Sequence, residues 1–376
     1  MKKWILRITI IVFAFIAGLV VTQSSRLITL VFRKAEQKSE SRLCNQSLQQ
    51  SSQTPKATPT PPIMKYSSPY EIERSIRVNP EANLKEVWEY WGVDTEVKSF
   101  WGGTNNKFLS HGSAWCEAET YEYDLDGDLE AETLLHIQDG SQESSRFMVF
   151  KRDRETNETL KWKLLGYIDH DFCKYQLPTH KVYISGGKTW LVVSHLQAAS
   201  GTGIALYFDR VFEIDSRGLT EVLIYMSDGH VDGGSGYPRW DISAAITNYQ
   251  KRNGAEFMTV VYKVSYSAFD YKDESHFSLW SKTQRAIYRR DNTSGTFILD
   301  TSKSDVTTRE IKVVYRETKS LAEDEPVYTE KDFFLYNHDE LMSIAKGADS
   351  RKKEWLRNFL ESCESAPREL QKLMNK

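Results

Sequence analysis

Residues 241–266 read DISAAITNYQKRNGAEFMTVVYKVSY and decide the fold class of this chain. The dipeptide Asn253-Gly254 separates two runs that are rich in β-branched and aromatic residues. Asn-Gly favours the two-residue turn, with positive φ angles, that joins neighbouring antiparallel strands. This stretch therefore predicts a β-hairpin with strands at 241–250 and 256–266.

The same pattern repeats on both sides of this hairpin. A second hairpin is predicted at 181–193, closed by Gly186-Gly187, and a third at 204–226, closed by the turn Asp215–Gly218. Because strands joined by tight turns pair antiparallel, we expect a meander of hairpins rather than a βαβ fold. Further strands are expected at 132–138, 146–151, 161–168, 278–290, 295–301 and 310–316.

Helices are expected to flank the strands, so the fold class is mainly β, and α+β overall. Apolar residues at helical spacing predict short helices at 70–78 and 84–92. The C-terminal part is predicted to form three more helices: 339–346 before Gly347, 351–363 after a Ser350 cap, and a last one after a Ser365 cap.

The N-terminus carries an uncharged apolar run from Ile8 to Val21, next to Lys2, Lys3 and Arg7. The run has 14 residues, and 18 when it is counted from Trp4 with the Arg7 side chain extended toward the headgroups. Residues 1–34 are therefore predicted to be a transmembrane helix or signal-anchor segment. A cleaved signal peptide is the alternative, but no A-x-A cleavage site follows the run.

Residues 35–65 are rich in Ser, Gln, Thr and Pro and are predicted to be a disordered linker. A β-rich globular domain is expected at 66–330, followed by a helical extension packed on it at 331–376. We expect a single-pass protein of the cell membrane whose C-terminal domain is extracytoplasmic, or a secreted protein if the leader is cleaved.

The charges of the chain are distributed unevenly. Residues 1–66 hold ten Lys and Arg against two Glu, which leaves 39 basic and 50 acidic side chains for the remainder. A basic leader fits a membrane as partner, because anionic lipids attract Lys and Arg. An acidic body argues against nucleic acid as a partner, since phosphate binding needs clustered positive charge.

Four cysteines occur, and none of them has the spacing of a zinc site. Outside the cytoplasm Cys116 and Cys173 are a possible disulfide pair. Buried thiols without a disulfide are the equally plausible alternative.

The sharpest chemical motif is the run Asp124-Leu125-Asp126-Gly127-Asp128-Leu129-Glu130-Ala131-Glu132 before a predicted strand. Carboxylates at every second position around a glycine turn bring oxygens toward one point. Such an oxygen cluster suits a hard divalent cation, Ca²⁺ more readily than Mg²⁺. A solvated acidic turn is the alternative, and the run is not an EF-hand because its sixth position is Leu129 instead of Gly.

This run resembles the calcium-binding loop of FG-GAP and VCBS-type repeats, the integrin-like propeller family. The resemblance covers residues 124–151 and occurs once, whereas the family repeats it. It implies Ca²⁺ as cofactor and a role in adhesion or ligand binding. It also implies the metal ligands, which would be Asp124, Asp126, Asp128, Glu132 and a backbone carbonyl near Glu130. Leu129 departs from the family pattern, which has Gly at this position.

Catalytic residues are not identified by any complete motif. His170 and His230 have acidic neighbours in the sequence, Asp171 and Asp232, and could serve acid–base catalysis. A hydrolase built on them would need two or more of His170, His195, His230 and Asp232 to converge in one cleft.

The sequence therefore favours a non-catalytic, calcium-stabilised binding module of the cell envelope, with a protein or glycan as its partner. An envelope hydrolase with a loop-borne His/Asp site is the alternative.

Overall fold

The computed structural model describes residues 66–79, 84–94, 96–97, 106–107, 116–139, 144–153, 161–170, 178–199, 204–215, 218–231, 238–270, 273–313 and 329–375. Residues 63–376 form one compact unit. The predicted anchor at 1–34, the linker at 35–65, and Cys173 as partner of Cys116 all lie outside the described residues. Among the described helices, none is long and apolar enough to cross a membrane.

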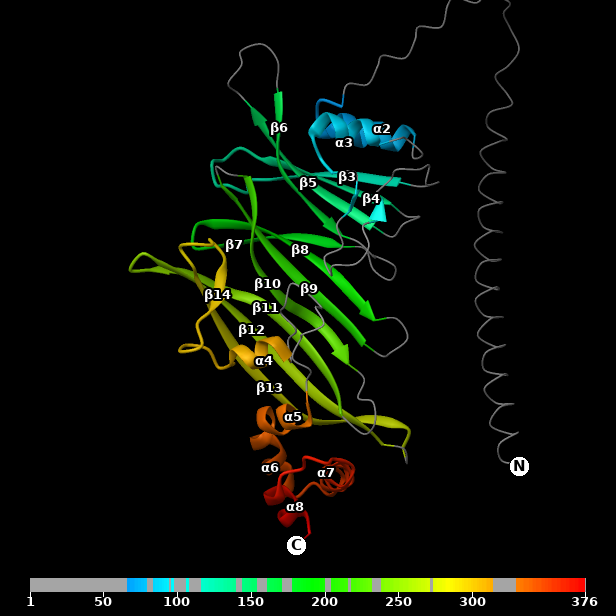
Figure 1. Ribbon diagram of the computed structural model, residues 1–376, viewed down its shortest axis with the longest axis vertical. Coiled ribbons are helices and arrows are strands. Elements are labelled where there is room, and N and C mark those ends of the chain that lie inside the picture. Colours follow the sequence, from blue (N-terminus) through cyan, green and yellow to red (C-terminus); the bar gives the residue numbers. More distant parts are fainter. Residues whose placement is uncertain are drawn as a thin grey trace, which may run out of the picture. The chain divides into compact units, whose positions relative to one another are not determined.

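The largest element is an eight-stranded antiparallel sheet whose strands follow one another in chain order (Figure 1). This confirms the predicted meander of hairpins. Its strands are β7 (Thr179–Ser185), β8 (Lys188–Ala199), β9 (Ile204–Asp215), β10 (Gly218–Val231), β11 (Arg239–Arg252), β12 (Ala255–Asp270), β13 (Ser275–Arg290) and β14 (Phe297–Leu299).

Two of the turns between these strands have the positive φ angles that their sequences predict. Asn253 and Gly254 join β11 to β12 with φ angles of 50° and 79°, and Gly186 and Gly187 join β7 to β8 with 59° and 76°. Two consecutive positive φ angles match the right-handed twist of the flanking strands. The pairing of Arg252 with Ala255 then sets the register for the rest of the β11–β12 pair.

A second, four-stranded antiparallel sheet precedes the large one, in the order β3-β4-β5-β6. Its strands are β3 (Cys116–Tyr123), β4 (Glu132–Asp139), β5 (Ser144–Asp153) and β6 (Lys161–His170), and a separate pair is formed by β1 (Glu96–Val97) and β2 (Asn106–Lys107).

Helices α2 (Pro69–Val78) and α3 (Lys85–Trp91) pack on one face of the four-stranded sheet, as Figure 1 shows. The other face packs on the eight-stranded sheet. The alternation of side chains along β4 produces both contacts, because Leu135 and Ile137 join the helices while Leu134 points the opposite way. The layer between the two sheets consists of Leu134, Phe147, Val149 and Ile168 from the small sheet, Leu191, Val193, Phe212 and Ile214 from the large one, and Leu125 from the turn before β4. We call this set the inter-sheet layer.

In the described residues after the large sheet, five helices occur: α4 (Thr308–Val313), α5 (Glu330–Tyr336), α6 (His338–Lys346), α7 (Ser350–Ser362) and α8 (Arg368–Met374). They share a core with strands β12 and β13, where Phe333 lies between Trp280 of the sheet and Phe359 of α7. The helices at 70–78, 84–92 and 339–346 were predicted within one residue of their ends.

The predicted strand at 310–316 is wrong, because its first residues belong to α4. The Thr307 hydroxyl accepts a hydrogen bond from the Glu310 backbone amide at 3.1 Å and so starts a helix. The Glu310 carboxylate is buried, and it accepts a hydrogen bond from the Gln284 side chain at 2.9 Å. This contact between distant parts of the sequence holds the helix in place. The secondary-structure propensity of residues 310–316 does not reveal it.

Two predicted caps are also wrong, and one helix was missed. Asp349 caps α7 by accepting from the Lys352 amide, so Ser350 is the first helical residue. Pro367 precedes α8, while the Ser365 amide donates to Glu330. Helix α5, which was not predicted, begins with a capping box between Thr329 and Asp332.

The two sheets approach each other closely at Gly218, and a substitution there tests this contact. A Cβ on Gly218 would lie 2.4 Å from the Leu165 backbone oxygen of β6, and its φ of 114° disfavours any side chain. We expect Gly218→Ala to lower the free energy of unfolding by about 2–3 kcal/mol, measured by urea denaturation.

Gly187→Ala is the matched control, since Gly187 also has a positive φ but a Cβ there meets nothing within 4 Å. It should cost only about 1 kcal/mol. Equal losses for the two variants would contradict the close approach of the sheets at Gly218.

Candidate metal centre

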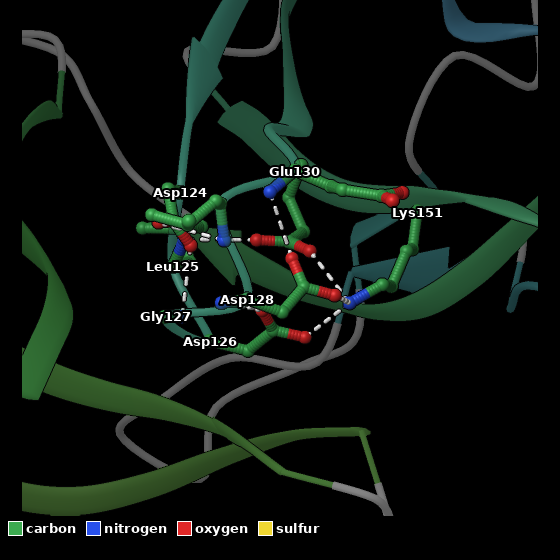
Figure 2. A network of polar contacts seen from close by, with 9 residues as sticks. Asp124, Leu125, Asp126, Gly127, Asp128, Glu130 and Lys151 are labelled. Atoms are coloured by element: carbon green, nitrogen blue, oxygen red, sulfur yellow. Dashed lines mark hydrogen bonds and ion pairs between the residues drawn. The ribbon is translucent and has the colours of Figure 1, made fainter.

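The acidic run forms the turn between β3 and β4, and its own carboxylates hold its shape (Figure 2). Asp124 Oδ1 accepts from the Gly127 amide at 2.8 Å, and Asp124 Oδ2 accepts from the Leu129 amide at 3.2 Å. Asp128 Oδ1 accepts from the Glu130 amide at 2.8 Å. Aspartate favours such local bonds to following amides, so the sequence of this run itself favours a tight loop.

Leu129 adopts the left-handed backbone conformation that usually requires glycine. Its φ is 70°, next to 81° for Gly127, and its side chain is 92% exposed. A leucine in the left-handed region costs about 1–2 kcal/mol. The side chain gains no packing that would offset this cost, so the backbone of the loop requires the positive φ. The leucine at this position therefore leaves the turn intact.

Three of the predicted ligands converge. Asp124, Asp126 and Asp128 each offer a carboxylate oxygen, and these oxygens lie within 4.8 Å of one another. Glu130 is not part of this group and contributes its backbone amide to the loop instead.

Glu132 lies beneath the three aspartates and is fully buried. Its Oε2 accepts from the Leu125 amide at 2.8 Å. Its Oε1 lies 3.2 Å from Lys151 Nζ, without the geometry of a hydrogen bond. Burial raises the pKa of this carboxyl, although the bond from Leu125 opposes the shift. The Lys151 ammonium is therefore the charged partner of this buried oxygen, and a metal ion at Glu132 would have to displace it.

Sequence reasoning missed Lys151, which lies on β5 and reaches into the acidic loop (Figure 2). Its ammonium donates to Asp126 Oδ2, and to Asp128 Oδ2 at 2.6 Å. This bond from Lys151 lowers the pKa of Asp128. Partial burial opposes the charge on Lys151, but its bonds to Asp126 and Asp128 outweigh burial and raise its pKa. Lys151 thus acts as a counter-ion to the loop, and only cross-strand geometry reveals it.

A cavity of about 600 Å³ lies beside the loop. Asp126, Asp128 and Lys151 form one wall, and Lys163 of β6 and Asp215 of β9 lie on others. Both sheets therefore contribute to the cavity, and its charged lining suits a polar or ionic ligand better than an apolar one.

The histidines proposed for catalysis take different positions. His170 and His195 come together, with ring centroids 5.2 Å apart, but they lie at the inter-sheet layer and are 3% and 8% exposed. Burial lowers the pKa of His195 to about 3 and that of His170 well below its usual value. His230 is on β10, paired with Asp241 of β11 in the ladder, and Asp232 lies outside the described residues. The two candidate histidines that come together are therefore buried, and His230 lies on a different strand.

Searches against protein-family models, curated proteins and solved structures found no match to this chain. The site is therefore assigned from its own geometry.

Removing Lys151 tests whether it is the counter-ion of the loop. In chelator we expect Lys151→Met to lower the free energy of unfolding by about 1–2 kcal/mol, because the loop carboxylates then repel one another without a neutralising charge. Lys163→Met, which removes an exposed lysine from the same cavity, should change it by less than about 0.5 kcal/mol. A Lys151→Met protein as stable as the wild type in chelator would contradict this role.

Proposed function

We propose that this chain is a membrane-tethered, extracytoplasmic binding module without catalytic activity, and that calcium occupies its β3–β4 loop. The observation that carries the proposal is the convergence of Asp124, Asp126 and Asp128 oxygens within 4.8 Å, above the buried Glu132.

The chemistry of the loop supports calcium over other cations. All candidate ligands are carboxylate or backbone oxygens, which Ca²⁺ and Mg²⁺ prefer to nitrogen or sulfur. Ca²⁺ accepts six to eight oxygens in flexible geometry, and water can complete a set of three or four carboxylates. Mg²⁺ demands a near-ideal octahedron, which an exposed, irregular loop supplies poorly.

Lys151 sets the expected strength of binding. An incoming calcium ion has to displace the Lys151 ammonium from Asp126 and Asp128, and this exchange weakens the apparent affinity. We therefore expect a dissociation constant of about 10⁻⁴ to 10⁻³ M, the range of extracellular calcium modules. Calcium at this level is available outside cells, which agrees with the predicted extracytoplasmic location.

The cavity beside the loop is the proposed ligand site of the module. Once calcium neutralises the aspartates, Lys151 is released from them, and it faces the cavity together with Arg152 and Lys163. The expected partner is a protein or glycan of the cell envelope that presents carboxylates to these cations. The membrane tether rests on the apolar run from Ile8 to Val21.

Thermal and urea unfolding with calcium and with chelator test the metal site. At a hundredfold excess over the dissociation constant, an ion bound only to the folded state adds about 2.7 kcal/mol to the free energy of unfolding. We expect Asp126→Asn to abolish this gain, since it removes one ligand charge from the centre of the triad.

Asp153→Asn is the control, because Asp153 lines the same cavity outside the triad. It should keep the calcium-dependent gain. No gain in the wild type, or an equal gain in Asp126→Asn, would rule out the loop as the calcium site.

A further inference from the structure

At one end of the inter-sheet layer, three histidines occupy inward-facing positions next to the apolar residues of the layer. On β4, His136 follows Leu134 at a spacing of two, on β6 His170 follows Ile168, and on β8 His195 follows Val193. Since side chains alternate along a strand, each histidine faces the same way as the apolar residue before it. All three are buried, at 6%, 3% and 8% exposure.

The strand register brings these rings together. His136 is paired with Phe147 of β5 and stacks on its ring at 3.9 Å between centroids. The Phe147 ring lies edge-on to His170 at 5.8 Å. His170 then meets His195 of the large sheet at 5.2 Å, so the cluster contains rings from both sheets.

Some of the polar atoms in this cluster are buried without a hydrogen bond. Ser145 is paired directly with His170 in the ladder. Ser145 Oγ, His136 Nε2 and His170 Nε2 are buried and accept or donate no hydrogen bond among the described residues. A positive charge on His136 or His170 would have to leave water without gaining a strong hydrogen bond, whereas His195 also interacts with the Phe208 backbone.

The charged groups around His170 disfavour a further positive charge. His170 faces His136, His195 and Arg210, and all three are basic. The Arg210 guanidinium is held there by Glu221 at 2.7 Å, and it donates to the Asp169 backbone oxygen at 3.3 Å. The Asp169 carboxylate, which could attract a proton to His170, forms a bidentate pair with Arg146 at 2.6 and 3.0 Å.

The other two histidines have engaged neighbours as well. His195 faces Arg210 and Asp209, and the Asp209 carboxylate already accepts bonds from Lys181, Ser194 and Tyr225.

His136 faces His180, whose ring is hydrogen-bonded to the Tyr123 hydroxyl at 3.0 Å and lies near Glu119. On β3, Glu119 is paired with His136 in the ladder, but it is exposed and accepts a hydrogen bond from the Tyr121 hydroxyl.

We infer that the histidine end of the inter-sheet layer is an acid-sensitive joint, at which protonation of His136, His170 and His195 separates the four-stranded sheet from the eight-stranded one. Separation brings water to the rings and exposes the apolar residues of the layer. The inference does not rest on calcium binding at the β3–β4 turn, although Leu125 of that turn packs in the same layer.

The sign of the pH dependence follows from the burial of the rings. Burial lowers the pKa of His136 and His195 to about 3, whereas an unfolded histidine has a pKa of about 6.5. The stability that each neutral ring contributes is fully present above pH 6.5 and is lost as the pH falls below it. Between pH 7 and pH 5 each ring should raise the unfolding equilibrium constant about 25-fold, and three rings on the order of 10⁴-fold.

Urea denaturation of the full chain in detergent, at pH 7 and pH 5 and with chelator present, tests this inference. The measured quantity is the factor by which the unfolding equilibrium constant rises between pH 7 and pH 5. We expect this factor to be about 25-fold smaller in His170→Leu than in the wild type. In His170→Leu/His195→Leu it should be smaller again by a similar factor. His276→Leu, at an exposed position on β13, should leave the rise unchanged. A rise that is the same in the wild type and the double variant would overturn the inference.

Hydrogen exchange of the wild-type chain gives a second test that needs no variant. After correction for intrinsic rates, protection of the β4, β6 and β8 amides should fall between pH 7 and pH 5 by at least tenfold more than protection of the β12 amides. Loss of protection that is uniform over both sheets would overturn the proposal of a joint, because it would mean global acid unfolding.

Discussion

The contact between the two sheets is the constraint on which the rest of the structure depends. It requires glycine on both sides, since a Cβ on Gly166 would lie 2.7 Å from Leu219 Cβ, and one on Gly218 would lie 2.4 Å from the Leu165 oxygen. The residues of the inter-sheet layer are almost entirely excluded from water. At close-packed density such a layer cannot shift without loss of many contacts, so it fixes the four-stranded sheet on the large one.

This fixed contact places two chemically different features at the same junction. The cavity beside the acidic loop takes its walls from β5 and β6 on one side and from the end of β9 on the other. The histidines lie on β4, β6 and β8, farther along the strands that form the layer. A calcium-stabilised loop and an acid-sensitive joint would therefore act on one interface from two sides. Calcium would strengthen the fold of the small sheet, and acid would weaken its packing.

Much of the fold follows from local sequence, because turn chemistry fixes register. Asn253-Gly254 and Gly186-Gly187 specify hairpins wherever they lie between alternating strands, and the aspartates of the acidic loop fold it through bonds to amides two to five residues away. What could not be predicted depends on contacts distant in sequence. Helix α4 is held by Gln284, and the loop is neutralised by Lys151, 25 residues from Asp126. The approach of His170 to His195 depends on how two sheets pack, which no strand pattern specifies.

The most direct test of the proposed metal centre is a crystal structure of the chain grown with calcium at several millimolar. It should contain an ion about 2.3–2.6 Å from oxygens of Asp124, Asp126 and Asp128, with the Lys151 ammonium moved away toward the cavity. Lys151 still bound between Asp126 and Asp128, with no ion at the loop, would contradict the proposal and identify the acidic run as a loop closed by its own lysine.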